Sequence, residues 1–512
     1  MRALSMSPAS DQSSLRVHPF GKGKRMSTRA YRLPQAHMAM VTVILLAFAW
    51  RAWGLNFQSL WRDEVDALRF ATRPWPELLA MFIRPGENGP LFFLLLRPWL
   101  AIAGHSEYAL RFASLMAGVI AVALSMVLSG RLGAPRSVRL IAGLLLATNP
   151  YLVWYSQEGK MYALITALIL ASSLSFVEAL QRSEVWRWVL YWLWTTLCLY
   201  VHVLAALIIP VHFSWFVVGG SDGRRRWRSY VTALASLTLP YLPLGWWQLK
   251  MLMDNHFRPG FPFLPLDQMI TVLLLAFGRG LAPTFGAWDI MPMLFLTLTG
   301  VWMGDELIQG HRVSQRLRPL AWLGLWLALP VLSLFAISLR VPLFTDRYLI
   351  WISPALWILV ALGTIAIQRY SRWIATFALG SMMALNLQAT NFQTHVPIKS
   401  DFRQAAAIVE GQRDPGDAVM VIMPYVRHVY AYYAASDPPF IEPPYTNAGA
   451  TPEQVDMEMR RRLAGHRGVW LVSSEEEFWD QRGLVRAWLE TYGERIIDHH
   501  FTRVNVTYYR LN

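Results

Sequence analysis

The stretch MAMVTVILLAFAWRAWGLNFQSLWRDEVDALR (residues 38–69) joins an apolar run to two adjacent carboxylates, Asp63 and Glu64. The carboxylates follow ten residues after the apolar run ends at Trp53. A run of this composition is typical of a membrane segment. Two charges just beyond such a segment are either solvated in a loop or face a cavity at the membrane surface. Only the second arrangement would make them candidates for chemistry.

The composition indicates a polytopic membrane protein. Of the 512 residues, 54% are hydrophobic and 16% are charged, whereas about 25% of a soluble domain is charged. A single cysteine, Cys198, excludes a disulfide framework and a cysteine-based zinc site. We therefore expect one large membrane domain with an appendage.

The positive charge of the chain lies mainly in short loops between apolar runs. The net charge is +14, yet residues 395–512 hold 16 acidic and 13 basic residues, so the excess lies before residue 395. Basic loops between spans mark the cytoplasmic side of a membrane protein, so we expect no nucleic-acid partner. These loops are at Arg131/Arg136/Arg139, Arg182/Arg187, 224–228, Arg312/Arg316/Arg318 and Arg369/Arg372.

The N-terminal residues 1–35 are basic and predict a disordered cytoplasmic tail. No small-residue cleavage site follows the apolar run that begins near Met38, so we expect an uncleaved anchor. With the N-terminus inside, the first span emerges on the external side.

The alternation of sides decides which apolar segments cross the membrane. Only one membrane crossing fits between the first span and the basic loop at 131–139, and the segment 108–130 is the better candidate for it. We therefore expect the segment 91–104 to form an interfacial helix instead. Residues 54–107 then form one external loop. The segment 266–282 is non-crossing for the same reason. The predicted fold is a mainly α membrane bundle of about 11 spans, near 38–53, 108–130, 138–153, 161–179, 188–201, 203–219, 230–249, 288–304, 319–339, 348–368 and 373–390.

The pattern changes near residue 393. The stretches AVMVIM (418–423) and GVWLVSS (468–474) read as buried strands, and they alternate with helical stretches. This alternation predicts a small external α/β domain, without a glycine-rich phosphate loop and hence without a nucleotide role. We expect a division into residues 1–35, 36–392 and 393–512.

Polar residues accompany the apolar runs at several places on the predicted external side. Taken singly, each has a simpler explanation: an arginine can anchor at the interface, Glu158 and Lys160 can pair locally, and His202 can be a satisfied hydrogen-bond donor. Charged groups at bundle depth are costly, however, and are usually paired or functional. The candidates are Asp63–Glu64, Glu107 with Arg111, YSQEGKMY (155–162), TDRY (345–348), Tyr200 and His202.

The candidates together favour one chemistry. A carboxylate can remove a proton from an acceptor hydroxyl that lies within hydrogen-bond reach. Arginines can hold and neutralise a phosphate leaving group. One carboxylate on an interfacial loop with several cations at the same level therefore predicts transfer from a lipid-linked phosphate donor.

The chain resembles the GT-C membrane glycosyltransferases of the bacterial type, in particular glycosyltransferase family 39 and its relatives, the protein O-mannosyltransferases and the lipid A aminoarabinose transferases. The resemblance covers roughly residues 40 to 390 and extends to the C-terminal stretch KSDFRQAA. Asn88 and Gly89 replace the His and first Pro of the family's His-Pro-Pro-Leu motif, and Lys160 stands where many relatives have Arg. The matching stretches, in order, are WRDE (61–64), NGPLFFLLLRPW (88–99), SEYALRFAS (106–114), NPYLVWYSQEGKMY (149–162) and RYL (347–349).

The resemblance implies an inverting transfer of a hexosyl or pentosyl group. Asp63 would be the general base and Glu64 would support it or, as in some members, help to hold a divalent cation. No metal ligand set is predicted and no cofactor is certain. Arg111, Arg347 and Lys160 would bind the donor phosphate, while the substrate cavity would include Asn88, Glu158, Tyr162, Tyr200, His202 and Tyr348.

The predicted function is an integral membrane glycosyltransferase of the cell envelope, in the inner membrane, with the C-terminal domain external or periplasmic. Its partners would be a polyprenyl-phosphate-linked sugar, membrane lipids, and a glycolipid, polysaccharide or protein acceptor. A transporter or flippase for a lipid-linked saccharide is the alternative. The replacement at Asn88 and Gly89 also leaves an inactive glycan-binding scaffold open.

Overall fold

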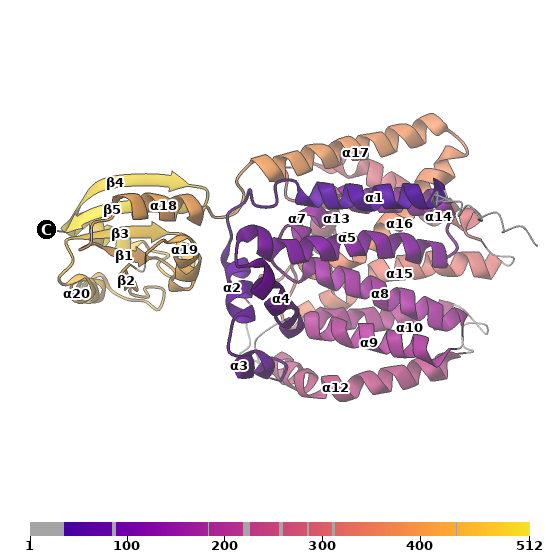
Figure 1. The fold of residues 1–512 in the computed structure, drawn as a ribbon, viewed down its shortest axis with the longest axis horizontal. Coiled ribbons are helices and arrows are strands. Elements are labelled where there is room, and N and C mark those ends of the chain that lie inside the picture. The colour runs from indigo at the N-terminus through magenta and orange to yellow at the C-terminus, as the bar shows by residue number, and fades with distance from the viewer. Residues whose placement is uncertain are drawn as a thin grey trace, which may run out of the picture.

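The computed structural model describes residues 35–83, 89–182, 184–218, 226–254, 260–283, 286–309, 313–436 and 438–511. Residues 1–34 of the predicted tail (1–35) and Asn88 lie outside these ranges, and Gln35 is the first residue of a helix. The chain forms a bundle of helices and, at its C-terminus, a smaller α/β region built on one sheet; the two meet at one end of the bundle (Figure 1).

Helices occupy each of the segments predicted as spans. Their bounds, with two short 3-10 helices, are α1 (Gln35–Ala52), α5 (Glu107–Arg131), α6 (Arg136–Thr148), α7 (Pro150–Ser156), α8 (Tyr162–Gln181), α9 (Val185–Val201), η1 (Val203–Leu207), α10 (Ile208–Val218), α12 (Trp227–Met253), α14 (Met291–Met303), α15 (Val313–Ser338), η5 (Asp346–Ile352), α16 (Ser353–Gln368) and α17 (Arg372–His395). Among the described residues, four helices are long and apolar enough to cross a membrane, and α6 with α7 forms a fifth candidate bent by 59°. The count of about 11 crossings stays a prediction.

Two glycines let α14 and α16 approach closely. A Cβ atom at Gly363 would lie 1.8 Å from the Leu296 carbonyl oxygen, and one at Gly300 would lie 2.0 Å from that of Leu359. Small residues at such crossings are typical of helix packing in membranes.

The break between α6 and α7 is fixed by a buried arginine. Pro150 cannot continue the helical ladder, and the Arg51 guanidinium donates to the Ala147 carbonyl at 2.8 Å and the Leu146 carbonyl at 3.0 Å. Arg51 also donates to the Ser156 hydroxyl at 3.1 Å. The chain that follows, 157–161, is thereby held at the end of the bundle.

The loop between α1 and α5 contains three helices, α2 (Arg62–Ala71), α3 (Trp75–Ala80) and α4 (Pro90–Ala103). They lie at the end of the bundle that faces the C-terminal region (Figure 1). The segment predicted as an interfacial helix is α4, and the segment predicted as non-crossing at 266–282 is α13 (Leu266–Arg279).

The C-terminal sheet has the order β2-β1-β3-β5-β4. Both predicted strands are present, β1 (Ala418–Val421) and β3 (Gly468–Ser473), and they are parallel neighbours. The remaining elements are α18 (Phe402–Gln412), η6 (Pro424–Val426), α19 (Arg427–Tyr433), β2 (Phe440–Ile441), α20 (Pro452–Leu463), η7 (Glu476–Phe478), α21 (Leu484–Tyr492), β4 (Gly493–Phe501) and β5 (Val504–Leu511).

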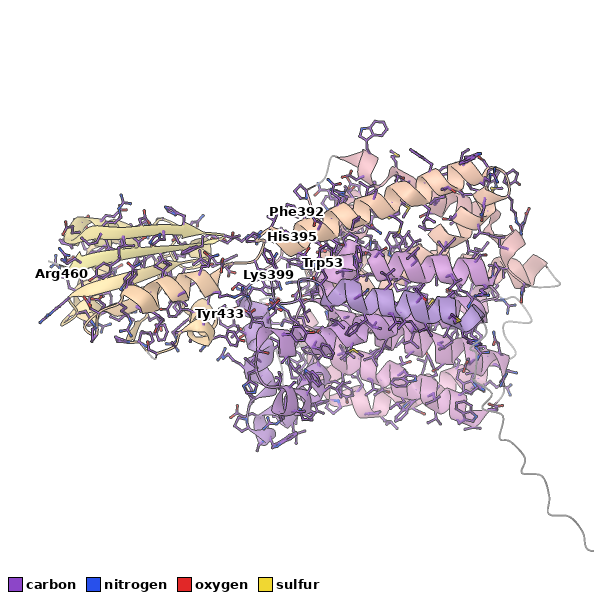
Figure 2. All side chains as sticks on the ribbon, turned by 45° about the horizontal axis from the view of Figure 1, so that its top comes forward. Trp53, Phe392, His395, Lys399, Tyr433 and Arg460 are labelled. Carbon is purple, nitrogen blue, oxygen red and sulfur yellow. The ribbon has the colours of Figure 1, made fainter. Side chains whose placement is uncertain are left out.

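Hydrogen bonds join the first loop to the chain that enters the C-terminal region. The Gln58 amide donates to the Gln393 carbonyl at 2.9 Å and accepts from the Ile398 N–H at 2.9 Å. The Leu60 N–H donates to the Tyr433 hydroxyl at 2.6 Å. Figure 2 shows Tyr433 and Lys399 at this junction.

Candidate active site

Glu64 is the centre of a buried charge cluster. Its carboxylate is fully buried and accepts from Arg111 Nε at 2.8 Å and Nη2 at 2.9 Å. Lys399 Nζ donates to it at 2.7 Å and the Gly159 N–H at 2.9 Å. Glu64 therefore joins α2, α5, the loop before α8 and the linker to the C-terminal region.

The ionisation of this cluster follows from burial and charge. Burial opposes the ionisation of Glu64, but Arg111 and Lys399 outweigh it and lower the pKa of Glu64 to about 2. Burial also lowers the pKa of Lys399, and here the attraction of Glu64 does not fully compensate. The carboxylate thus holds the two cations in place.

Arg111 uses all of its donors within the protein. A guanidinium has five N–H groups; besides the two bonds to Glu64, Nη1 donates to the carbonyls of Leu55 at 3.0 Å and Gln58 at 2.8 Å. Nη2 donates to the Ser59 carbonyl at 3.2 Å. This geometry leaves Arg111 no N–H for a phosphate, and it fixes the loop that leads into α2.

Asp63 lies on α2 beside Glu64 but has a different environment. Its carboxylate lies 3.4 Å from Arg347 Nη1, and both side chains are 20% exposed. The Arg347 guanidinium lies 5.5 Å from the Trp61 ring centre and 5.7 Å from that of Tyr162. Asp63 and Arg347 are thus an accessible acid–cation pair.

A cavity of about 760 Å³ lies between the bundle and the C-terminal region. Its walls come from both, and the junction residue Lys399 lies between them. Among the lining residues are Trp61, Arg62, Trp154, Glu158 and Arg347 from the bundle, and Ser474, Glu475, Glu477, Phe478 and Arg503 from the C-terminal region. Arg347 therefore lines the cavity, and Asp63 is in contact with this lining residue.

Glu158 is a buried carboxylate in the cavity lining. Burial raises the pKa of Glu158 to about 7, against the attraction of Lys399 and Arg347. Neither of its oxygens has a hydrogen-bond partner among the described residues. Glu158 is therefore available to a ligand.

Some of the other predicted residues lie near Arg347, and others lie away from it. Tyr162 is buried under Arg347, and the ring of Tyr348 lies 4.8 Å from that of His202. His202 Nδ1 accepts from the Leu204 N–H at 3.2 Å, so this ring caps η1. Tyr200 is directed elsewhere, because its hydroxyl donates to the Pro240 carbonyl.

Lys160 is half-buried, and neither it nor Tyr200 lines the cavity. The structure thus brings together Asp63, Glu158, Tyr162 and Arg347 from three separate stretches of the chain. Lys160 as a phosphate ligand stays a prediction.

Sequence reasoning missed Lys399 and the cavity residues of the C-terminal region. Lys399 is 335 residues from its partner Glu64, and no local pattern predicts such a pairing. The sequence feature that could have indicated Lys399 is the run KSDFRQAA, which contains this lysine at the junction.

A divalent cation does not fit this site. Both Glu64 oxygens accept two hydrogen bonds each from Arg111, Lys399 and the Gly159 N–H. Within the described parts of the chain, no three His, Cys, Asp or Glu side chains gather closely enough to hold a metal ion. Glu64 is therefore not placed as a ligand for a cation.

One protein-family model matches part of the chain. Residues 87–247 match the family model for dolichyl-phosphate-mannose-protein mannosyltransferase. No curated protein matches the chain in sequence.

Solved structures match along nearly the whole chain. ArnT from Cupriavidus metallidurans bound to undecaprenyl phosphate is 12% identical with a TM-score of 0.58, over 93% of this chain and 98% of that one. Its apo form has a TM-score of 0.59 at 13% identity, over 93% and 97%. The Archaeoglobus fulgidus oligosaccharyltransferase in complex with Zn and sulfate has a TM-score of 0.55 at 13% identity, over 92% and 72%. The chain therefore has the fold of the GT-C membrane glycosyltransferases, as its sequence predicts.

Proposed function

We propose that this protein is an integral membrane glycosyltransferase that moves a sugar from a polyprenyl-phosphate donor to an acceptor hydroxyl. The GT-C fold supports the class, and the undecaprenyl phosphate bound to ArnT supports the kind of donor. The end of the bundle that carries the cavity would face the external or periplasmic side of the inner membrane, together with residues 393–512.

The observation that carries the proposal is the contact between Asp63 and Arg347, of which Arg347 lines the cavity. Asp63 takes the proton of the acceptor hydroxyl, and the oxygen attacks the anomeric carbon of the donor sugar. The bond between that carbon and the phosphate oxygen breaks, so the polyprenyl phosphate leaves with the bonding electrons. Attack opposite the leaving group inverts the anomeric centre.

Arg347 is the cation proposed to receive the phosphate. Its Nε is buried and has no hydrogen-bond partner among the described residues, whereas Arg111 donates all of its N–H groups within the protein. Fixed cations at a departing phosphate are among the largest contributions an enzyme makes to such a reaction. Glu64 then has a positioning role: it fixes the first turn of α2, on which Asp63 lies.

The test replaces Asp63 by Asn in the purified full-length protein, with donor lipids extracted from membranes of a strain that lacks the gene. Loss of general-base catalysis is expected to lower the release of polyprenyl phosphate by about 10²- to 10⁴-fold, while the thermal stability stays near that of the wild type. Mass spectrometry of the lipid products gives the rate, and mass spectrometry of envelope glycans with and without the gene identifies the sugar.

The matched control is Asp66→Asn. Asp66 lies one turn further along α2, pairs with Arg69 at 3.2 Å and accepts a hydrogen bond from the Tyr425 hydroxyl, and neither of these partners lines the cavity. Its replacement should leave the rate close to wild type. Wild-type turnover in Asp63→Asn would remove Asp63 from the base role.

A further inference from the structure

On both walls of the cavity between the bundle and the C-terminal region, there are buried polar atoms that have no hydrogen-bond partner among the described residues. On the bundle side these atoms belong to Trp61, Glu158 and Arg347, and on the C-terminal side to the Ser474 hydroxyl. Buried polar groups are nearly always hydrogen-bonded, so a group of orphans around one cavity calls for an explanation. A polar ligand that touches both walls would provide it.

The C-terminal wall is made by turns at one end of the strands of the sheet. The turn after β3 supplies Ser474, Glu475, Glu477 and Phe478, and the turn between β4 and β5 supplies Arg503. The two turns are neighbours because Ser473 at the end of β3 pairs with Asn505 near the start of β5. In sheets of this kind, ligands bind beyond the carboxyl ends of parallel strands.

Backbone strain is concentrated in this wall. In the described part of the chain, three non-glycine residues have a positive φ, and two of them, Glu475 and Arg503, line the cavity with φ of 55° each. Such residues cost free energy and cluster at ligand sites, where the conformation has a function. Here the left-handed turns hold two charged side chains at the cavity.

The wall is held in a fixed position relative to the proposed base. The Arg62 guanidinium, one residue before Asp63, contacts the Glu475 carboxylate at 2.9 Å. The turn itself is fixed by Asn447, which donates to the Glu477 carbonyl at 3.0 Å, and by Arg486, which contacts Glu476 at 2.6 Å. One residue of α2 therefore contacts the C-terminal wall while the next contacts Arg347.

The chemistry of the wall fits a sugar ring. Phe478 is 59% exposed although it lines the cavity, and an exposed aromatic face can stack on the C–H face of a pyranose. Glu475, Glu477 and Ser474 can bond vicinal hydroxyls. A peptide would instead be recognised by addition to an open strand edge or by apolar pockets, whereas the edge strands β2 and β4 provide none of the lining residues in the described chain.

We propose that the turn Ser474–Phe478, together with Arg503, is an acceptor subsite for a saccharide, which it presents to Asp63 across the cavity. This inference rests on the proposed glycosyltransferase function and specifies its acceptor. The acceptor would be a glycolipid or polysaccharide rather than a protein hydroxyl.

The experiment measures two reactions of the full-length protein with the same donor lipids. The first is donor turnover to water, without an added acceptor. The second adds either a set of methyl hexopyranosides and methyl pentopyranosides or a serine- and threonine-containing peptide. The variants are Phe478→Ala and Ser474→Ala, with Tyr492→Ala as control, because Tyr492 is exposed and contacts Arg460 at the far end of the C-terminal region (Figure 2).

Glycosides are expected to accelerate donor turnover and the peptide is not. Phe478→Ala should lower kcat/KM for the glycoside about tenfold, mainly through KM, and leave turnover to water unchanged; Tyr492→Ala should change neither. The inference would be overturned if only the peptide, or neither acceptor, accelerated donor turnover. It would also be overturned if the glycosides accelerated donor turnover equally in Phe478→Ala and the wild type. Absence of any donor turnover in the wild type would instead refute the proposed function.

Discussion

The substitution Glu64→Gln tests the charge cluster most directly. It removes the carboxylate but keeps the shape of the side chain, so the buried cations Arg111 and Lys399 lose the negative charge that they share. Breaking a buried ion pair by removing one partner costs about 3–5 kcal/mol. A pKa lowered from 4.5 to about 2 corresponds to about 3 kcal/mol at neutral pH, since one pKa unit is about 1.4 kcal/mol. We therefore expect Glu64→Gln to lower the free energy of unfolding by about 3 kcal/mol at neutral pH.

The contribution of Glu64 to stability should decrease as the pH falls. Because the pKa of Glu64 is lower in the folded than in the unfolded chain, its stabilisation is fully present above about pH 4.5 and is lost as the pH falls towards 2. The difference between wild type and Glu64→Gln should therefore be about 3 kcal/mol at pH 7 and less than half of that at pH 3. Denaturant titration of the purified protein in mixed micelles, followed by tryptophan fluorescence, measures it.

Two further variants sharpen the test. Glu306→Gln breaks an exposed ion pair with Arg369 and should cost at most about 1 kcal/mol. Lys399→Met should recover part of the loss in the Glu64→Gln background, because one unpaired buried cation is removed. A cost of Glu64→Gln no larger than that of Glu306→Gln, or one that is the same at pH 3 and pH 7, would refute the reasoning.

Two other predictions concern stability. Burial raises the pKa of Glu158 to about 7, so the wild type should lose stability as the pH rises from 4.5 to 7. Glu158→Gln should therefore be more stable than the wild type at pH 8 and as stable as the wild type at pH 4.5. Thermal unfolding of both proteins at the two pH values measures this difference. Gly363→Ala places a Cβ atom 1.8 Å from the Leu296 carbonyl oxygen and should cost at least about 1–3 kcal/mol in the same denaturant titration. Its control is Gly324→Ala, where a Cβ atom meets no described atom within 4 Å; equal effects of the two glycine substitutions would contradict the packing argument.

Much of the bundle could be predicted from the sequence, because apolar length is a local property. The segments 91–104 and 266–282 were separated from the spans by the parity of the basic loops, and each forms a helix of 14 residues, α4 and α13. In the C-terminal region the buried runs of β1 and β3 predicted strands for the same reason. The hairpin of β4 and β5 was not predicted, because β4 is largely exposed and gives only a weak alternating pattern.

The sequence by itself determined that Asp63 and Glu64 lie together shortly after an apolar segment ends, since their adjacency and the apolar run are both local. Only the tertiary structure decided which of the two carboxylates is buried in an ion cluster and which is partly exposed. Successive residues of a helix point about 100° apart, so Glu64 turns into the bundle towards Arg111 and Lys399, while Asp63 faces Arg347 at the cavity. Each of these partners comes from a distant part of the chain, and such pairings arise from packing rather than from any local pattern.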